Sequence, residues 1–129
     1  MNTTGFHKIV QDHVPLHDNI TIVEDVEQFK IDDIENGVIM VWVNWSVGYL
    51  NCKYSIECLQ DKKYSGQIFI IDIDTIQADF QKTVLKSRLN GWGEIFLIKN
   101  GQVIESFLGK ESSIAFKTYI DKYADTYSR

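Results

Sequence analysis

The sequence has few cysteines and no clustering of basic or apolar residues, and these shortages exclude several classes of protein. Its 129 residues include only two cysteines, and a chain of this length buries a core large enough to fold without metal or disulfide staples. The 13 Lys and Arg are scattered, with no basic run longer than Lys62 and Lys63, so we expect no nucleic-acid or anionic-membrane partner. No apolar stretch approaches the ~20 residues of a bilayer span, and residues 1–8 lack the pattern of a secretory signal. We therefore expect a cytoplasmic protein with one apolar core.

The two cysteines are not expected to form a disulfide with each other. Cys52 and Cys58 fall in one predicted helix. On a helix, their spacing corresponds to ~9 Å of rise and ~120° of rotation, whereas a disulfide tolerates at most ~7 Å between Cα atoms. The spacing also matches neither a zinc knuckle nor the C-x-x-C redox pair. A disulfide-free protein with two free thiols is typical of a reducing compartment.

Residues 1–18 are predicted to form an N-terminal arm outside the main domain, which spans residues 19–129. A short helix is expected over about residues 4–11, and it is broken near Pro15 because proline disfavours helical geometry at the preceding residue. The arm holds all three histidines of the chain, His7, His13 and His17. Their spacing crosses the proline and no acidic or thiol ligand is fixed beside them, so we expect a solvated arm and no metal site.

From Asn19 onward, predicted strands and helices alternate. Apolar and β-branched runs predict strands over residues 19–24, 38–43 and 67–74, and two more within residues 94–109. Asn100 and Gly101 join the last two as a type I′ hairpin. Apolar periodicity and capping residues predict helices over about residues 25–36, 49–63, 76–89 and 112–123. The order is β-α-β-α-β-α-β-β-α, with parallel crossovers first and an antiparallel hairpin last.

Three motifs follow one another in a specific order and spacing. They are WVNW at residues 42–45, IDID at residues 71–74 and GWGEIFLIKNG at residues 91–101. In this order they resemble the thioredoxin family, which has W-x-x-W at the end of the second strand and G-[IV]-P-T-x-x-x-[FL]-K-N-G before and within the hairpin. The resemblance covers about residues 19–123. It implies an α/β fold, namely a thioredoxin-like three-layer α/β/α sandwich with a mixed sheet that follows an N-terminal helical arm.

The chemical elements of that family are replaced in this sequence. Where the family has C-G-P-C, whose first thiol is activated at a helix N-terminus, this chain has Ser46, Val47, Gly48 and Tyr49. The family's cis-proline aligns with Gly93, and its peptide bond is expected to be trans because a cis bond before a non-proline residue costs ~3 kcal/mol. The family's buried acid aligns with Met40. The resemblance thus implies the scaffold without the dithiol chemistry, and no cofactor.

Three further groups are candidate chemical sites. Cys52 continues an apolar stripe of its helix, so core packing is favoured over a reactive thiol, and nothing near Cys58 in sequence suggests activation. Ser46 lies at a helix start, where capping or a loop role is favoured because no histidine falls in the mapped fold. Asp72 and Asp74 end a strand of the scaffold, and we expect no metal there.

Large aromatic residues are predicted to gather at one end of the sheet. Trp45, Tyr49 and Trp92 come from loops that flank the family's active site, and such clusters are typical binding hot spots. The loop before the hairpin is expected to pair with an extended peptide by strand addition, with Glu94 favouring a basic partner residue. The predicted partner-binding set is Trp45, Ser46, Val47, Gly48, Tyr49, Trp92, Gly93 and Glu94.

Three hypotheses for function follow from these residues. The first is a redox-inactive thioredoxin-like module that binds a protein or peptide partner. The second is a monothiol redox enzyme or thiol sensor that uses Cys52 or Cys58, and thiol reactivity distinguishes it from the first. The third is a structural subunit that pairs through its aromatic end or its N-terminal arm. Fold alone does not choose among them, because one fold hosts unrelated functions.

Overall fold

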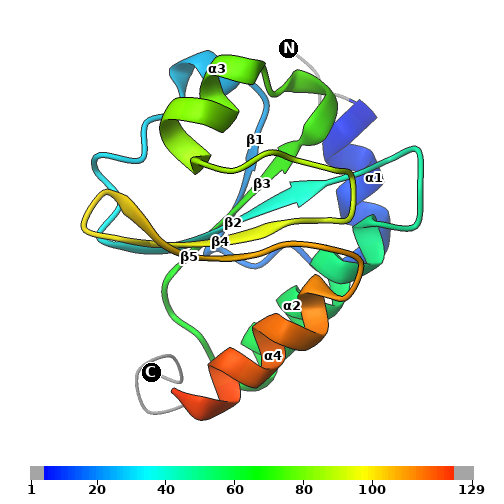
Figure 1. The fold of residues 1–129 in the computed structure, drawn as a ribbon. Helices are drawn as coiled ribbons and strands as arrows, with labels where there is room; N and C mark the ends of the chain where they lie inside the picture. The colour runs from blue at the N-terminus through cyan, green and yellow to red at the C-terminus, as the bar shows by residue number, and fades with distance from the viewer. Residues whose placement is uncertain (1–4, 124–129) are drawn as a thin grey trace.

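Five strands form one mixed sheet at the centre of the computed structural model, which describes residues 5–123 (Figure 1). The strand order is β1-β3-β2-β4-β5. The strands are β1 (Ile20–Val23), β2 (Asn36–Trp42), β3 (Gln67–Asp72), β4 (Ile95–Lys99) and β5 (Gln102–Phe107). β1 and β2 each pair with β3 in parallel, β4 runs antiparallel to β2, and β5 runs antiparallel to β4. The predicted parallel crossovers and terminal hairpin are confirmed.

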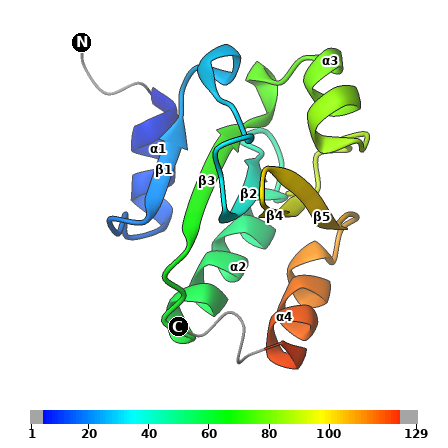
Figure 2. The same cartoon turned by 90° about the vertical axis from the view of Figure 1, so that its left-hand side faces the viewer.

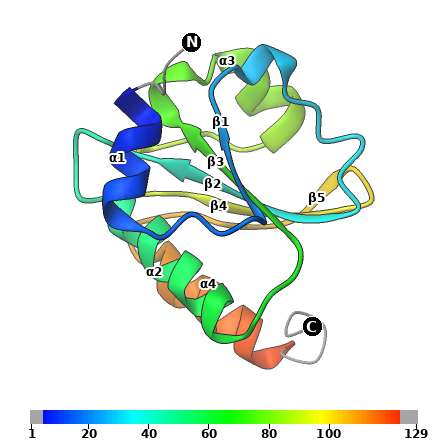
Figure 3. The ribbon, with the colours of Figure 1, turned by 180° about the vertical axis from the view of Figure 1, so that it is seen from behind.

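Helices cover both faces of this sheet and make the predicted three layers (Figure 3). One face carries α1 (Gly5–His13), α2 (Tyr49–Asp61) and α4 (Ser112–Lys122), and the other carries α3 (Ala78–Phe80) and the π-helical turn η3 (Gln81–Leu85). Side chains of β2 alternate between the two cores, because successive residues of a strand point to opposite faces. Met40 packs toward α2, and its neighbours Ile39 and Val41 pack toward η3.

The hairpin between β4 and β5 follows the prediction closely. Asn100 and Gly101 have φ angles of 50° and 79°, which are the positive values that a type I′ turn requires. Their N–H groups donate to Glu35 and Ile34 carbonyls at 2.8 Å each. The hairpin tip is therefore tied to the segment that precedes β2.

The prediction of a helix over residues 25–36 is wrong. Only a 3₁₀ turn, η1 (Val26–Gln28), forms there, and Asp25 caps it by accepting from the Glu27 N–H at 3.0 Å. Asp32, Asp33 and Glu35 would lie at the C-terminal end of such a helix, where the helix dipole disfavours negative charge. Asn36 and Gly37, expected to end a helix, instead begin β2.

The third predicted helix, over residues 76–89, is broken into pieces. A 3₁₀ turn, η2 (Ile73–Thr75), precedes α3, and η3 follows directly. The segment ends at Lys86, whose φ of 55° is left-handed and cannot continue a right-handed helix. The sheet face beneath this segment is therefore covered by short turns instead of a long helix.

The N-terminal segment is not the solvated arm that the sequence suggested. Helix α1 buries Val10 completely, and the residue after the helix, Val14, is 2% exposed. Both side chains belong to the core beneath α2 and α4. The prediction was wrong because it rested on the terminal position of the segment, whereas the burial of a nine-residue amphipathic helix depends on whether a complementary apolar face is nearby.

Candidate functional site

The loop between β2 and α2 presents apolar side chains to solvent. Trp45 is 60% exposed and Val47 is 68% exposed. The indole Nε1 of Trp45 donates to Asp74 Oδ1 at 3.0 Å, and a Cβ placed on Gly91 would fall on the far edge of this indole. Trp45 is therefore held over the neighbouring loop by a hydrogen bond and a ring contact, and Asp74 acts as its anchor.

A second loop, residues 90–94, lies against the first. Trp92 is 40% exposed, and the glycines on either side of it, Gly91 and Gly93, have φ angles of 81° and 84°. A Cβ on Gly48 would collide with the Gly91 carbonyl, and one on Gly93 would collide with the Gly48 carbonyl. Glycine is required at these positions because the two backbones touch directly. The Trp92–Gly93 bond is trans.

Glu94 is fully buried, so the expectation of a surface carboxylate beside the aromatics is wrong. Its Oε2 accepts from the backbone N–H of Asn90 at 3.0 Å and, at a longer 3.4 Å, from that of Trp92. Its Oε1 is also buried, and no described group hydrogen-bonds to it. Glu94 directly precedes β4, whose Ile95 pairs with Met40. A carboxylate is therefore buried one residue before the strand position that pairs with Met40.

Asn51 is a site residue that the sequence did not single out. From the first turns of α2 its Nδ2 donates to the Trp92 carbonyl at 2.6 Å and to the Lys110 carbonyl at 3.1 Å. Its Oδ1 accepts from the N–H and hydroxyl of Ser113 at 3.1 and 2.7 Å. One buried amide thus joins α2, the Trp92 loop and the start of α4. The sequence signal for this role of Asn51 is that a polar residue stands beside the apolar stripe of the predicted helix.

The backbone of the Trp92 loop is largely occupied by these internal bonds. The Gly91 carbonyl accepts from the Ser46 hydroxyl at 3.3 Å, and the Gly93 carbonyl accepts from the Ser112 hydroxyl at 2.9 Å. The N–H and carbonyl of Trp92 are bonded to Glu94 and Asn51. Strand addition was predicted here, yet a peptide would have to displace these bonds. The loop offers side chains to a partner more readily than it offers a free strand edge.

Tyr49 begins α2 and is covered by α1. The His13 ring lies 4.6 Å from the Tyr49 ring and 5.9 Å from the Trp42 ring, and Trp42 lies 5.5 Å from Tyr49, between ring centroids. His13 lies outside residues 19–123, in the segment predicted to be a solvated arm, yet its ring packs against the domain. The first residue of α2 is therefore an aromatic ring that packs against the last residue of α1.

Ser46 is a loop residue with internal hydrogen bonds. Its hydroxyl donates to Gly91 and accepts from the Gly48 N–H at 3.1 Å. Gly48, not Ser46, occupies the cap position of α2. Both partners of the hydroxyl are backbone groups, so no general base is in place to activate it.

The two cysteines lie in different surroundings. Cys52 is fully buried, and its Sγ donates to the Val41 carbonyl at 3.3 Å, which confirms the predicted core packing. Burial strongly raises the pKa of Cys52, and the charge of Glu94 raises it further. Cys58 is half-buried, and burial followed by the charge of Asp121 raises its pKa as well. Both thiols are free, and both are less acidic than an ordinary cysteine.

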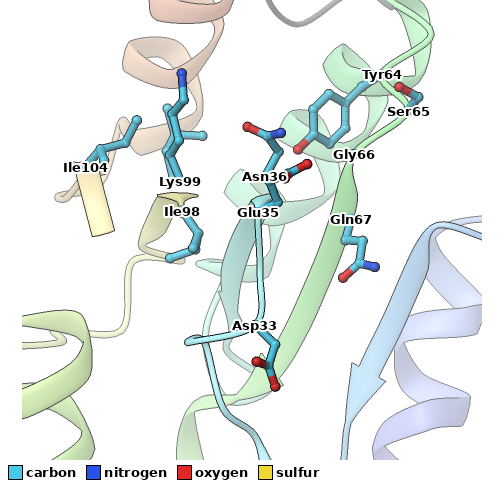
Figure 4. A pocket seen from close by; sticks show the side chains of 12 residues that line it. Asp33, Glu35, Asn36, Tyr64, Ser65, Gly66, Gln67, Ile98, Lys99 and Ile104 are labelled. Carbon is cyan, nitrogen blue, oxygen red and sulfur yellow. The ribbon is translucent and has the colours of Figure 1, made fainter. Parts of the chain in front are cut away.

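A hollow of about 640 Å³ opens at the opposite end of the sheet, where β2 and β3 begin (Figure 4). Lys99 and Ile104 approach from the hairpin, and Tyr64 approaches from the segment after α2. Burial raises the pKa of Tyr64 to about 12. Within residues 5–123 no three metal-binding side chains converge, and none of the helices there is long and apolar enough to cross a bilayer. The hollow mixes both charge signs, since Asp33 and Glu35 line it together with Lys99.

Comparison with known proteins identifies the fold. No family model and no curated protein matches the chain. Two structures of thioredoxin from Plasmodium falciparum superpose with TM-scores of 0.60, at 21% and 25% identity, and the matches cover 79% and 81% of this chain and 97% and 98% of theirs. Mitochondrial thioredoxin 3 from Saccharomyces cerevisiae gives a TM-score of 0.59 at 19% identity, covering 79% of this chain and 94% of that one. The chain therefore has a thioredoxin-like α/β fold.

Proposed function

We propose that this thioredoxin-fold protein is a binding or scaffold module without dithiol redox activity. Ser46 and Tyr49 stand where the family has its two thiols, and Met40 stands where it has its proton acceptor. Thiol–disulfide exchange needs an attacking thiolate and a second thiol that releases the mixed disulfide. Neither is present at the end of the sheet where the family performs this step.

The observation that carries the proposal is the exposed apolar surface at that end, formed by Trp45, Val47 and Trp92. These side chains are 60%, 68% and 40% exposed, and contacts among Trp45, Gly91 and Gly48 make them neighbours. Large aromatic side chains bury ~150–250 Å² each and restrict few torsions when they bind. A protein or peptide partner with an apolar contact surface fits this chemistry.

The hydrogen bonds within the Trp92 loop favour recognition of a partner through side chains and not through the backbone. The carbonyls of Gly91, Trp92 and Gly93 already accept internal hydrogen bonds, and Glu94 is buried. A partner would therefore gain most from Trp45, Val47 and Trp92, and little from an added strand or from a contact with Glu94.

The rival function, monothiol chemistry at Cys52 or Cys58, is less well supported. A reactive cysteine needs a lowered pKa and access to solvent. Cys52 is fully buried, and the pKa values of both thiols are raised. The cytoplasmic location remains a prediction from the free thiols.

The proposal is tested by capturing partners from the native source with wild-type protein and with Trp92→Ala. We expect a specific partner to be lost with Trp92→Ala and kept with Tyr54→Ala, a matched control because Tyr54 is 51% exposed on α2. Chemical denaturation of both variants shows whether a partner is lost because a contact is missing or because the variant is less stably folded. A partner that binds Trp92→Ala as well as wild type would contradict the assigned surface, and a concentration-dependent dimer that Trp92→Ala abolishes would favour the structural-subunit hypothesis.

A further inference from the structure

A second surface, unrelated to the aromatic end, lies where the η1 region meets α3. Figures 1 and 2 show the η1 turn, which follows β1, and α3 on the side of the sheet that is remote from α2 and α4. Residues 24–32 and 75–84 enclose a hollow of about 500 Å³ there. This volume falls within the ~300–1,000 Å³ of known ligand pockets.

The charge of this hollow is strongly one-sided. Its lining contains five acidic residues and one basic residue, Lys30. The acids are Glu24, Asp25, Glu27, Asp32 and Asp79, and all five are exposed. None of them forms an ion pair with a residue in the described part of the chain. Within the described part of the chain, Asp25 is the one acid of the five whose carboxylate accepts a hydrogen bond, as the cap of η1, so the other four carboxylates are available to a ligand.

The floor of the hollow is apolar. The rings of Phe29 and Phe80 lie 6.4 Å apart, and Phe29 also packs at 5.0 Å from Phe69 in the core. Val26, Ile31 and Val84 complete the apolar lining, and all three keep partly accessible surface. The floor stays open because η1, α3 and η3 are short turns that cover this sheet face incompletely.

We propose that this hollow, hereafter the acidic hollow, binds a basic amphipathic segment of a partner protein. An apolar side chain of the partner packs against the accessible surface of Phe29 and Phe80, and flanking Lys or Arg residues meet the acidic rim. The apolar contact and the unpaired carboxylates both contribute to affinity, and the carboxylates also accelerate association and exclude acidic partners. A second copy of the chain would bring one acidic rim against another if this face paired with itself, and like charges oppose that contact.

The direct test is a fluorescence-anisotropy titration of the full chain with a labelled helical peptide of Leu and Lys in amphipathic order. The double variant Glu27→Gln/Asp79→Asn removes two rim charges without touching the η1 cap. Asp61→Asn/Glu111→Gln is the matched control, because it removes two exposed charges far from the hollow. We expect binding about tenfold weaker for the rim variant, and no more than about twofold weaker for the control.

Two further measurements decide between specific docking and general attraction. A peptide in which Ser replaces every Leu should bind much more weakly, and amide chemical shifts should change in residues 24–32 and 75–84. The proposal is overturned if both variants lose affinity equally, if the Ser peptide binds as tightly, or if the shifts gather around Trp92. A dimer of the chain that the rim variant dissociates would assign the surface to a second copy instead.

Discussion

Glu94 organises the loop that carries the most prominent aromatic residue of the site. Burying a carboxylate is costly, and the cost falls only when its oxygens accept hydrogen bonds. Here one oxygen accepts from the N–H groups of Asn90 and Trp92. The side chain thus fixes the position of Trp92 from inside the core.

Replacing Glu94 should therefore destabilise the protein in a graded way. Glu94→Ala leaves two N–H groups without their acceptor, and we expect a loss of about 1–3 kcal/mol in the free energy of unfolding. Glu94→Gln keeps an acceptor oxygen and removes a buried charge, so its loss should be smaller. Urea denaturation measures both, and equal losses would mean that the hydrogen bonds contribute nothing.

The raised pKa of Cys52 predicts that the stability of the protein depends on pH. Its pKa in the folded protein is raised well above the ordinary 9.0, so above that pH the unfolded chain loses a proton that the folded chain keeps. The free energy of unfolding should then fall as pH rises through 9.0, by up to about 1.4 kcal/mol per pH unit. Urea denaturation on either side of this pH tests the slope, and Cys52→Ala should reduce it. An unchanged slope in Cys52→Ala would assign the effect to another group.

At the scale of elements, α1 has become part of the core. It supplies Val10 to the apolar cluster under α2 and places His13 against Tyr49. The helix therefore packs against the first residue of α2 as well as against the core.

Truncating the inner face of α1 should weaken the whole fold. Val10→Ala removes two methyl groups from a fully buried position and should cost about 2 kcal/mol in the free energy of unfolding. Ile9→Ala is the matched control, because Ile9 is 37% exposed on the same helix and should cost much less. Similar losses in the two variants would indicate that α1 is not docked in solution.

For the whole molecule, the thioredoxin-like fold carries both cysteines, Cys52 and Cys58, within α2. Cys52 is fully buried and Cys58 is half-buried, so neither lies at an exposed helix N-terminus. Under the proposed function, the thioredoxin-like scaffold is present without the dithiol chemistry.

We accordingly expect no turnover in an insulin-reduction assay. Cys52 is inaccessible, and Cys58 has no second thiol beside it to release a mixed disulfide. A Cys52→Ser/Cys58→Ser variant should be indistinguishable from wild type. Turnover that disappears in this double variant would contradict the redox-inactive proposal and support monothiol chemistry.

Much of the sheet was predictable because strand signals are local. The apolar run of β2 and the alternation in β1 report burial through the side-chain period alone. Asn100 and Gly101 specify their turn by backbone preference. Cys52 was placed correctly for the same reason, since its burial follows from the stripe that it shares with Ile56 and Leu59.

The site itself depended on contacts between residues far apart in the chain. Glu94 is an ordinary surface residue by type, and only the N–H groups that the Trp92 loop turns toward it make its burial possible. Asn51 is similar, since its partners at Trp92, Lys110 and Ser113 lie 41 to 62 residues away. The sequence by itself determined the strands, the hairpin and the apolar stripe of α2, because these follow from local periodicity. Only the tertiary structure decided the docking of α1, the burial of Glu94 and the closed backbone of the Trp92 loop, because each needs a partner that the folded chain alone supplies.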